Sequence, residues 1–474
     1  MATHIHTSST PRKATGRTIA VMEAIRGRMA ARTLTSGERL PSIRGLAASM
    51  RVSPSTVVEA YDRLVAEGLI HARAGSGFYV SGAVPPLALA EVAPRRDRAI
   101  DPLWVSRQSL DADAGAPKPG CGWLPADWMP HAAIRRAIRG LARAEDALLA
   151  DYAGTRGSLA LRRVLVRQFA TEGLEVGADQ VLLTVSGTQA IDLICRFLLR
   201  PGDAVLVDDP CYFNFQALLR AHQAQVVGVP YTPTGPDLPR FEAALAAHRP
   251  RLYLTNSALH NPTGATLSPR TAHRLLNAAA AHDLTIVEDD IFADLEPEPS
   301  PRLAALDGLG RVIRIGSFSK TLSASIRCGY VAARADWIEA LVDLQVATSF
   351  GGPSPIAAEL VTRTLGDGSY RKHLDGLRRR LARARREASA RLALLGIRPW
   401  LAPRGGFYLW CRLPEGRDAA QVARTALQDN LVLAPGNVFS PSQSAAEFMR
   451  FNVAQMTGPQ VFEALARALA EQAQ

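Results

Sequence analysis

The sequence predicts an α/β protein with a mostly parallel central sheet, preceded by a separate and much smaller helical domain. From about residue 117 onward, short apolar runs alternate with helical stretches, as in sheets that are covered by helices on both faces. Residues 14–80 instead contain short amphipathic helical segments followed by two strand-like runs. At 474 residues the chain is too long for one compact core, so we expect more than one domain.

Seven apolar runs of strand length predict the central sheet. After residue 354 the pattern changes to long helices and a smaller mixed α+β unit. Residues 83–115 are rich in proline, alanine and charged residues without a sustained period, which is typical of a linker. We therefore predict a first domain over 14–82, a linker over 83–115 and a second domain over 116–474. The seven runs are 181–185, 204–208, 226–229, 252–255, 285–288, 312–316 and 329–333.

The overall composition excludes several classes of protein. With 47% hydrophobic and 21% charged residues, the chain is neither largely disordered nor collagen-like. No apolar run is long enough to cross a bilayer, and the first residues lack the apolar core of a secretory signal. The five cysteines are scattered and form no CxxC pair, which suits a reducing compartment. We expect a cytoplasmic protein without a metal site.

The positive charge is concentrated near the N-terminus. Residues 1–98 hold 14 lysines and arginines against 7 aspartates and glutamates, out of a net charge of +11 for the chain. A basic domain of this kind fits a nucleic-acid surface, and it also fits an ordinary solvated face. Charge alone leaves both interpretations open.

The first domain has the pattern of a winged helix-turn-helix. Ser42 and Ser53 are positioned to cap two short helices, and Pro54 suits the first helical position of the second. A hairpin around a Gly-Ser-Gly turn follows within residues 71–81. The small polar residues at the start of the second helix suit contacts with phosphates and base edges. A generic three-helix bundle is the alternative.

A longer motif favours the winged helix-turn-helix over the generic three-helix bundle. The pattern G-x-x-L-P-S-x-R-x-L-A, then V-S-x-x-T-V-x-x-A-Y-x-x-L-x-x-E-G-L-I, then G-S-G-F runs from Gly37 to Phe78. It resembles the DNA-binding domain of the GntR family, which implies double-stranded DNA as a partner. By match to that motif, six residues would contact DNA: Arg44, Ser53, Ser55, Thr56, Arg73 and Gly75.

Polar groups that suit a planar ligand with a phosphate follow several of the predicted strands. Residues 186–188 form a turn between a strand and a helix, where backbone N–H groups and hydroxyls could hold a phosphate. Tyr212 lies just beyond the next strand and could stack on a planar ring. Asn261, in an NPTG turn, could meet a ring oxygen. Each group also fits a purely structural role, such as core packing or a turn without a ligand.

Two further residues suit catalysis on such a ligand. Asp289 lies at the C-terminal end of a strand, where open α/β sheets bind ligands, and could keep a pyridine nitrogen protonated. Capping of the next helix is the alternative role for Asp289 or Asp290. Only four of the 55 basic residues are lysines, and Lys320 follows a buried strand. Because arginine stays charged, Lys320 is the candidate for a Schiff base, although a lone lysine is usually a solvated surface charge.

Taken in this order, the motifs resemble the fold-type I aminotransferase family over roughly residues 117–474. The resemblance implies pyridoxal 5'-phosphate as cofactor, with Lys320 and Asp289 as the catalytic residues. Arg450 would bind a carboxylate of a substrate or effector. Residues 122–130 resemble the arm that packs near the substrate. Further cofactor contacts would come from Ser186, Gly187, Thr188, Tyr212, Asn261, Ser317, Arg327 and, from a partner subunit, Tyr152.

The chain departs from the family at Phe292. Many members carry a tyrosine there, and its hydroxyl helps to set the electronics around the ring oxygen of the cofactor. Phenylalanine keeps the packing and loses this hydrogen bond. We therefore expect the chain to bind the cofactor, and we expect efficient transamination less firmly than cofactor binding.

The combination of both domains is similar to the MocR subfamily of transcription regulators. The resemblance implies a homodimer that senses an amine, an amino acid or pyridoxal phosphate and adjusts its DNA binding. Two alternatives stay open. The chain could be an active aminotransferase with an accessory DNA-binding domain, or a DNA-binding protein whose second domain holds no cofactor.

Overall fold

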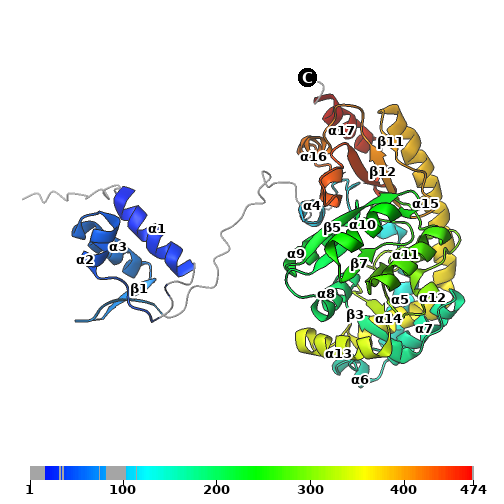
Figure 1. The fold of residues 1–474 in the computed structure, drawn as a ribbon, viewed down its shortest axis with the longest axis horizontal. Helices are drawn as coiled ribbons and strands as arrows, with labels where there is room; N and C mark the ends of the chain where they lie inside the picture. The colour runs from blue at the N-terminus through cyan, green and yellow to red at the C-terminus, as the bar shows by residue number, and fades with distance from the viewer. Residues whose placement is uncertain are drawn as a thin grey trace, which may run out of the picture. The chain divides into compact units, whose positions relative to one another are not determined.

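The computed structural model describes residues 16–30, 34, 37–73, 75–81, 103–113 and 115–471. The chain divides into two compact units, Met1–Asp97 and Arg98–Gln474, and each is described by itself (Figure 1). In the described ranges no helix is long and apolar enough to cross a membrane.

The first unit consists of three helices and a hairpin. Ser42 and Ser53 cap the second and third helices as predicted, and their hydroxyl oxygens accept hydrogen bonds from the backbone N–H groups of Gly45 and Thr56 at 3.1 and 3.2 Å. Arg51 adopts the left-handed conformation that makes the tight turn between these helices, with φ at 52°. The elements are α1 (Gly16–Ala30), α2 (Ile43–Met50), α3 (Pro54–Ala66), β1 (Ile70–Arg73) and β2 (Gly77–Val80).

Periodic apolar side chains give this unit its own core. They come from α1, α2 and α3 and from the hairpin. Strands β1 and β2 are antiparallel, and Ile70 lies opposite Val80. Gly75 and Gly77 in the hairpin turn have φ values of 70° and 105°, a region that favours glycine. The predicted winged helix-turn-helix is therefore confirmed. The core residues include Val21, Ile25, Leu46, Val57, Tyr61, Leu64, Ile70 and Val80.

The second unit is built on an eight-stranded sheet with the order β3-β10-β9-β8-β7-β4-β5-β6. Five neighbouring strands, from β9 to β5 in this order, are parallel, whereas β10 runs antiparallel between β3 and β9. Every apolar run that predicted the sheet lies in one of these strands, so the mostly parallel sheet is confirmed. The strands are β3 (Val181–Thr184), β4 (Ala204–Asp209), β5 (Gln225–Thr232), β6 (Gly235–Pro236), β7 (Leu252–Thr255), β8 (Thr285–Asp289), β9 (Val312–Ser317) and β10 (Gly329–Ala332).

Helices cover both faces of this sheet. Successive strand residues alternate between two cores: Val205 and Val207 pack with residues of α8 and α13, and Leu206 packs with residues of α7, α10 and α11. Because the parallel strands share one direction, their carboxyl ends meet along one edge of the sheet. The covering helices are α7 (Leu159–Thr171), α8 (Gly187–Leu198), α10 (Leu238–His248), α11 (Pro269–Ala281) and α13 (Ala335–Ser349).

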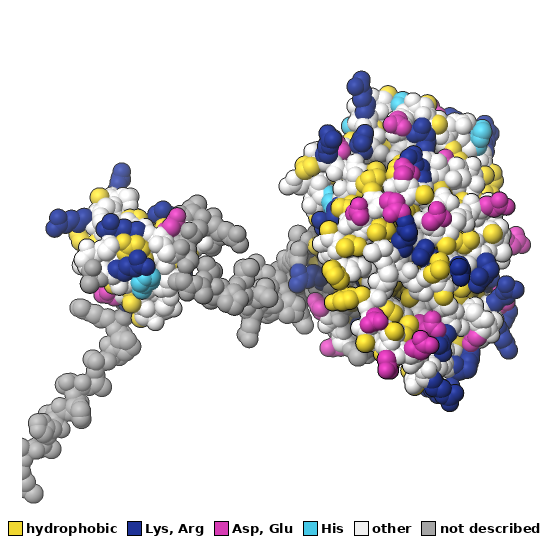
Figure 2. All heavy atoms as spheres, turned by 90° about the horizontal axis from the view of Figure 1, so that it is seen from below, with side chains coloured by type: hydrophobic (Ala, Val, Ile, Leu, Met, Phe, Trp, Pro, Cys, Tyr) yellow, Lys and Arg dark blue, Asp and Glu magenta, His cyan; other side chains and the backbone are white. Residues whose placement is uncertain are grey.

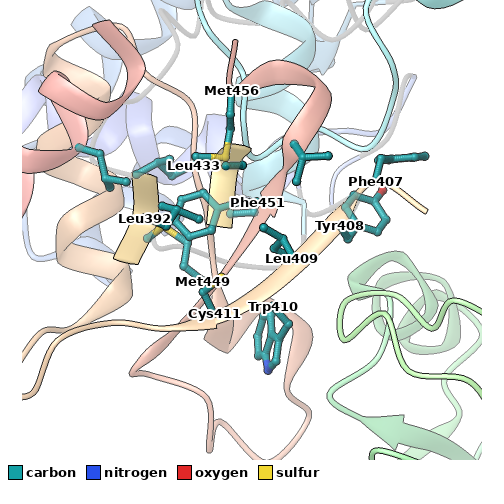
Figure 3. Close-up of a cluster of buried hydrophobic side chains, with 14 of the residues drawn as sticks. Leu392, Phe407, Tyr408, Leu409, Trp410, Cys411, Leu433, Met449, Phe451 and Met456 are labelled. Atoms are coloured by element: carbon teal, nitrogen blue, oxygen red, sulfur yellow. The ribbon is translucent and has the colours of Figure 1, made fainter. Parts of the chain in front are cut away.

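A smaller α+β subdomain follows, as predicted, and Figure 1 shows its elements gathered at one end of the second unit. Its sheet has the order β11-β12-β14-β13. Apolar side chains of the sheet and its helices form one cluster, in which Figure 3 shows Leu392, Leu433 and Phe451. The elements are α15 (Ser369–Leu394), α16 (Ala419–Gln428), α17 (Pro459–Ala470), β11 (Arg398–Pro399), β12 (Tyr408–Arg412), β13 (Ala434–Pro435) and β14 (Phe448–Asn452).

Shorter helices connect these layers. The remaining α-helices are α5 (His131–Leu141), α6 (Asp146–Ala150), α9 (Phe213–Ala221), α12 (Leu303–Asp307) and α14 (Pro355–Gly366). Single turns of 3₁₀ helix span Ala126–Trp128, Ala178–Gln180, Ala293–Leu295, Gly436–Phe439 and Val453–Gln455.

One helix lies where we predicted linker. Helix α4 spans Trp104–Asp111, and its first two residues, Trp104 and Val105, are buried in the cluster that contains the small-subdomain core. The prediction was wrong for this stretch because eight residues are too short to show a helical period and no side chain caps the N-terminus. Residues 83–102 of the predicted linker lie outside the described residues.

Candidate functional site

A cavity of about 370 Å³ lies at the edge of the main sheet where the parallel strands end. Its walls combine residues that follow β3, β4, β7, β8 and β9 with residues of α4 and with Tyr408 of β12. The structure brings together nine of the predicted site residues as lining of this one cavity. They are Ser186, Gly187, Thr188, Tyr212, Asn261, Asp289, Ser317, Lys320 and Arg327.

Lys320 lies in the loop after β9 and points into this cavity. Its Nζ donates a hydrogen bond to the carbonyl oxygen of Gly122 at 2.7 Å. Burial, followed by the positive charge of Arg450, lowers the pKa of Lys320 to about 8, against the weaker opposing effect of Asp289. More of this amine is therefore neutral near pH 7 than of an exposed lysine, and a nucleophilic amine must be neutral.

Asp289 is the last residue of β8 and lines the same cavity. Its Oδ1 accepts a hydrogen bond from the backbone N–H of Ile291 at 3.2 Å. Burial raises the pKa of Asp289 to about 7. Among the ion pairs of the described residues, none involves Asp289. Its carboxylate is thus buried without a cationic partner.

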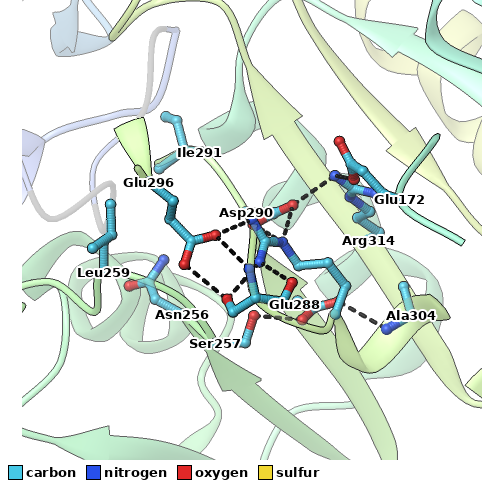
Figure 4. A network of polar contacts seen from close by, with 12 residues as sticks. Glu172, Asn256, Ser257, Leu259, Glu288, Asp290, Ile291, Glu296, Ala304 and Arg314 are labelled. Carbon is cyan, nitrogen blue, oxygen red and sulfur yellow. Dashed lines mark hydrogen bonds and ion pairs between the residues drawn. The ribbon is translucent and has the colours of Figure 1, made fainter. Parts of the chain in front are cut away.

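The two neighbours of Asp289 have different surroundings: neither Glu288 nor Asp290 lines the cavity, and both belong to a network of polar contacts (Figure 4). Asp290 pairs with Arg302 at 2.8 Å and with Arg314 at 2.6 Å. Glu288 accepts hydrogen bonds from two backbone N–H groups at the start of α12. Of the two aspartates, Asp289 is therefore the one that a ligand in the cavity would meet. Neither caps the short helix that follows.

Arg450 of β14 lies fully buried behind Asn261 and does not itself line the cavity. It donates one hydrogen bond to Oδ1 of Asn261 at 2.8 Å and another to the carbonyl oxygen of Gly120 at 2.7 Å. Its Nε has no hydrogen-bond partner among the residues that the structure describes. With its oxygen bound to Arg450, Asn261 has its amide N–H groups left for a ligand.

One end of the cavity suits an anion. Ser186 caps α8, and its Oγ accepts a hydrogen bond from the backbone N–H of Gln189 at 3.1 Å. Ser317 and the exposed Arg327 line the same cavity. Free backbone N–H groups in the first turn of a helix, hydroxyls and a guanidinium together favour a phosphate or carboxylate.

Aromatic side chains form other parts of the lining. The ring of Tyr212 lies 4.9 Å from that of Phe213, measured between centroids. Phe292 is buried, and its ring lies 5.6 Å from that of Tyr408. Its position in the lining offers packing and no hydrogen-bond donor, as expected from the sequence.

The structure does not bring Tyr152 to the cavity. Its side chain is 80% exposed, and its ring lies 5.0 Å from that of Phe350, which is itself 67% exposed. Within a single chain this aromatic pair is a surface feature.

Sequence reasoning missed several lining residues. Asn256 follows β7 directly, so the rule that found Asp289 would have found it; its Nδ2 donates to the backbone oxygen of Asp289 at 2.9 Å. Residues of α4 and Tyr408 carried no local signal. The other missed residues are Val105, Ser106, Ser109, Leu110, Ile191, Phe213, Ile291, Ser319 and Ala324.

Groups of histidine, cysteine, aspartate or glutamate that could hold a metal do not occur among the described residues.

In the first unit, the six positions predicted for DNA contact are all at least partly exposed. The Oγ of Ser53 lies 2.9 Å from the Oγ of Ser55 and 2.7 Å from the Oγ1 of Thr56, which gathers three hydroxyls at the start of α3. The guanidinium carbon of Arg73 lies 4.5 Å from the centre of the Tyr79 ring. Among the charged side chains on the face of this unit seen in Figure 2, lysine and arginine predominate over aspartate and glutamate. Arg44 lies on α2, and Gly75 lies in the hairpin turn.

Known proteins match both units. Residues 18–80 match the bacterial regulatory proteins of the gntR family, and residues 125–468 match aminotransferases of class I and II. Among solved structures, LysN, the α-aminoadipate aminotransferase of Thermus thermophilus in complex with N-(5'-phosphopyridoxyl)-L-leucine, superposes with a TM-score of 0.71 at 26% identity, over 77% of this chain and 95% of its own. The kynurenine aminotransferase of Pyrococcus horikoshii shares the fold, with a TM-score of 0.72 at 23% identity over 80% of this chain and 96% of its own.

Relatives that span both units are transcription regulators. The HTH-type transcriptional regulator YdcR of Escherichia coli (strain K12) is 30% identical over 451 residues, which are 92% of this chain and 94% of YdcR. The HTH-type transcriptional regulator NorG of Staphylococcus aureus (strain bovine RF122 / ET3-1) is 27% identical over 86% of this chain and 94% of its own. This chain therefore belongs to the HTH-type transcriptional regulators of MocR-like architecture, in which an aminotransferase class I and II domain follows a gntR-family domain.

Proposed function

We propose that this regulator binds pyridoxal 5'-phosphate on Lys320 and reads an amine or amino acid at the same site, and that the ligand changes its affinity for operator DNA. The observation that carries the proposal is the convergence of nine predicted site residues on one cavity. The cavity contains an amine with a pKa lowered to about 8 and a carboxylate without a cationic partner.

The chemistry of the donor set fits this cofactor. Ser186, Gly187 and Thr188, with Ser317 and Arg327, would hold the phosphate at the anion-binding end. The unpartnered carboxylate of Asp289 would face the ring nitrogen, Asn261 would donate to the ring oxygen, and Tyr212 would stack on the ring. When bound, the cofactor supplies a carbon that amines attack and a protonated ring that withdraws electrons.

Three residues of this chain would then do distinct work. Lys320 supplies the neutral amine, since its ammonium form is disfavoured by burial. Asp289 would hold a proton at the ring nitrogen; burial raises its own pKa to about 7, so a cation beside it would favour its charged form. Arg450, whose buried Nε has no partner, would bind the carboxylate of an amino acid.

A homodimer is the proposed assembly. The exposed pair of Tyr152 and Phe350 is apolar surface that a second copy would cover, and Tyr152 would reach the cavity of the partner. A two-fold dimer would also carry two winged-helix units, which suits paired half-sites in DNA. Arg44, Ser53, Ser55, Thr56, Arg73 and Gly75 would make the DNA contacts.

The test is a spectrum followed by a DNA-binding measurement. Purified protein with pyridoxal 5'-phosphate should show a visible absorption band that Lys320→Ala abolishes and that the exposed control Lys372→Ala retains. DNA from the region upstream of its own gene is then titrated with and without a panel of amines and amino acids. The proposal expects at least one ligand to change DNA affinity about fivefold or more, the lower end of common coupling. Sustained transamination with DNA affinity indifferent to every ligand would contradict it and favour an enzyme.

A further inference from the structure

Helix α4 forms one wall of the cavity and is fixed to the second unit at both ends. Val105 and Ser109 line the cavity from its interior, and Leu110 lies at the mouth, where it is exposed. At the N-terminal end Trp104 is buried in the core. At the other end the Nζ of Lys118 donates to the carbonyl oxygen of Ala112, the residue that ends the helix, at 3.1 Å.

Ser109 is the polar group that this wall presents. Its side chain is 1% exposed, and its Oγ has no hydrogen-bond partner within the described part of the chain. Buried hydroxyls nearly always have a partner, because an unpaired one has lost its hydrogen bonds to water. An unpaired hydroxyl in the lining of a ligand cavity therefore indicates a polar group on the ligand.

The cofactor does not account for this partner. This step rests on the proposed function, in which the phosphate, ring nitrogen, ring oxygen and reactive carbon of the cofactor are each matched to other residues. The amine attached to the cofactor is the ligand that remains for Ser109. The partner group on that ligand need not be the carboxylate, because the proposed function assigns the carboxylate to Arg450, whose buried Nε has no hydrogen-bond partner among the described residues.

The charged residues of the cavity lining limit which polar groups the side chain of the ligand can carry. The charged residues in the described lining are Asp289, Lys320 and Arg327, and all three are assigned to the cofactor. The charged residues of α4, Arg107 and Asp111, are exposed and do not line the cavity. A second carboxylate or ammonium on the ligand would thus be buried opposite a neutral wall, which is unfavourable.

We infer that α4 is the wall that selects the effector, and that Ser109 forms a hydrogen bond with an uncharged hydroxyl group on the side chain of the bound amine. Ser109 is then a specificity-determining residue of the regulator. Its partner lies on the variable part of the ligand, so the residue distinguishes ligands that Lys320 alone would accept equally.

The experiment compares amino acids that differ by one group. The cofactor-loaded chain is titrated with three pairs in which a terminal methyl replaces a hydroxyl: L-serine and L-2-aminobutyrate, L-homoserine and L-norvaline, and 5-hydroxy-L-norvaline and L-norleucine. The shift of the cofactor's absorption band gives each dissociation constant. In at least one pair the hydroxyl ligand should bind about fivefold to tenfold more tightly, the range of one net neutral hydrogen bond.

The variants isolate Ser109 in that pair. Ser109→Ala should remove the preference by weakening the hydroxyl ligand alone, and Ser109→Cys, which keeps the volume with a weaker donor, should give an intermediate preference. Gln108→Ala, on the same helix but outside the lining, should retain the full preference. Thermal unfolding and the unshifted band show whether each variant is folded and loaded.

The outcomes separate this inference from the proposed function. If no visible band forms in the native chain, the proposed function fails and this inference fails with it. If the band forms and amino acids bind, but no pair shows a hydroxyl preference, this inference alone is overturned. A preference that survives in both Ser109→Ala and Ser109→Cys also overturns it.

Discussion

The two sides of strand β8 differ in how their buried charges are paired. On one side Asp290 is held by Arg302 and Arg314, and Arg314 also pairs with Glu172. On the cavity side Asp289, one residue earlier, forms no ion pair with another described residue. Both aspartates are buried, so burial by itself does not distinguish a structural residue from a functional one. The presence or absence of a cationic partner is what distinguishes the two aspartates.

The two buried arginines differ in the same way. Arg314 reaches two carboxylates, whereas Arg450 reaches an amide oxygen and a backbone carbonyl and no carboxylate among the described residues. The buried charges of the network side are thus paired without a ligand, whereas Asp289 and Arg450 on the cavity side have no oppositely charged partner among the described residues. Substitutions on the network side should destabilise the fold, and substitutions on the cavity side should affect ligands.

The largest expected effect is on the network side. Asp290→Asn leaves Arg302 and Arg314 buried with too little negative charge, so the free energy of unfolding should fall by about 3–5 kcal/mol. Denaturant unfolding of the cofactor-free chain measures it. The matched control is Asp283→Asn, which breaks an exposed pair with Arg311 and should leave the unfolding midpoint unchanged. Equal unfolding midpoints for Asp290→Asn and Asp283→Asn would show that the buried network does not stabilise the fold more than an exposed ion pair does, and would contradict the comparison.

Asp289→Asn should have the opposite sign. Burial raises the pKa of Asp289 to about 7, so between its ordinary value and that pH the folded chain holds a proton that the unfolded chain releases. The free energy of unfolding of the native chain therefore falls as pH rises through this interval, and the variant lacks this loss. The variant should gain little near pH 4 and roughly 4 kcal/mol by pH 8 in the absence of cofactor. A gain that does not grow with pH would contradict the assignment.

Arg450→Met should separate binding from stability. The variant removes a buried charge without a carboxylate partner, but it also leaves Oδ1 of Asn261 and the carbonyl oxygen of Gly120 without their donor, so the free energy of unfolding of the cofactor-free chain should fall by about 1–3 kcal/mol. L-norvaline should bind the loaded chain roughly 30-fold more weakly, as for the loss of charged hydrogen bonds. n-Butylamine, which is L-norvaline without its carboxylate, serves as the internal control and should bind unchanged. Equal weakening of both ligands would indicate a general distortion of the cavity.

The smallest effect on the isolated fold is expected at Tyr152. Its side chain is 80% exposed, so Tyr152→Ser should leave unfolding of the single chain unchanged. If a partner copy places this tyrosine at the cofactor, the variant should still weaken cofactor affinity about threefold to tenfold, the range of one hydrogen bond. Leu394→Ser, at another exposed apolar residue, is the control and should change neither quantity. Full cofactor affinity in the tyrosine variant would remove its proposed role.

The sequence could predict the site residues that follow the ends of predicted strands. Lys320, Asp289 and Asn261 each follow a predicted strand, and parallel strands bring such residues to one edge. Alternation along β8 implies that Asp289 and Asp290 face opposite ways, but both faces of this sheet are buried, so periodicity could not tell which one faces a cavity.

Features that depend on packing between distant segments carried no local signal. Helix α4 is too short to show a period, and Ser109 becomes notable only because the helix lies over the cavity. That Arg450 lies behind Asn261 depends on the small subdomain meeting the main sheet across almost two hundred residues of chain. These contacts are tertiary, and a single sequence does not encode them in any short motif.

Helix α4 is also the first described element after residues 82–102, the stretch through which the chain leaves the DNA-reading unit. The proposed effector wall is therefore the described part of the second unit that is nearest in sequence to the first unit. Binding free energies are reciprocal, so an effector that alters operator affinity through α4 must have its own affinity altered by the operator by the same factor. The operator would then act as a ligand of the amine site, and the regulator would hold its effector differently on DNA and free of it.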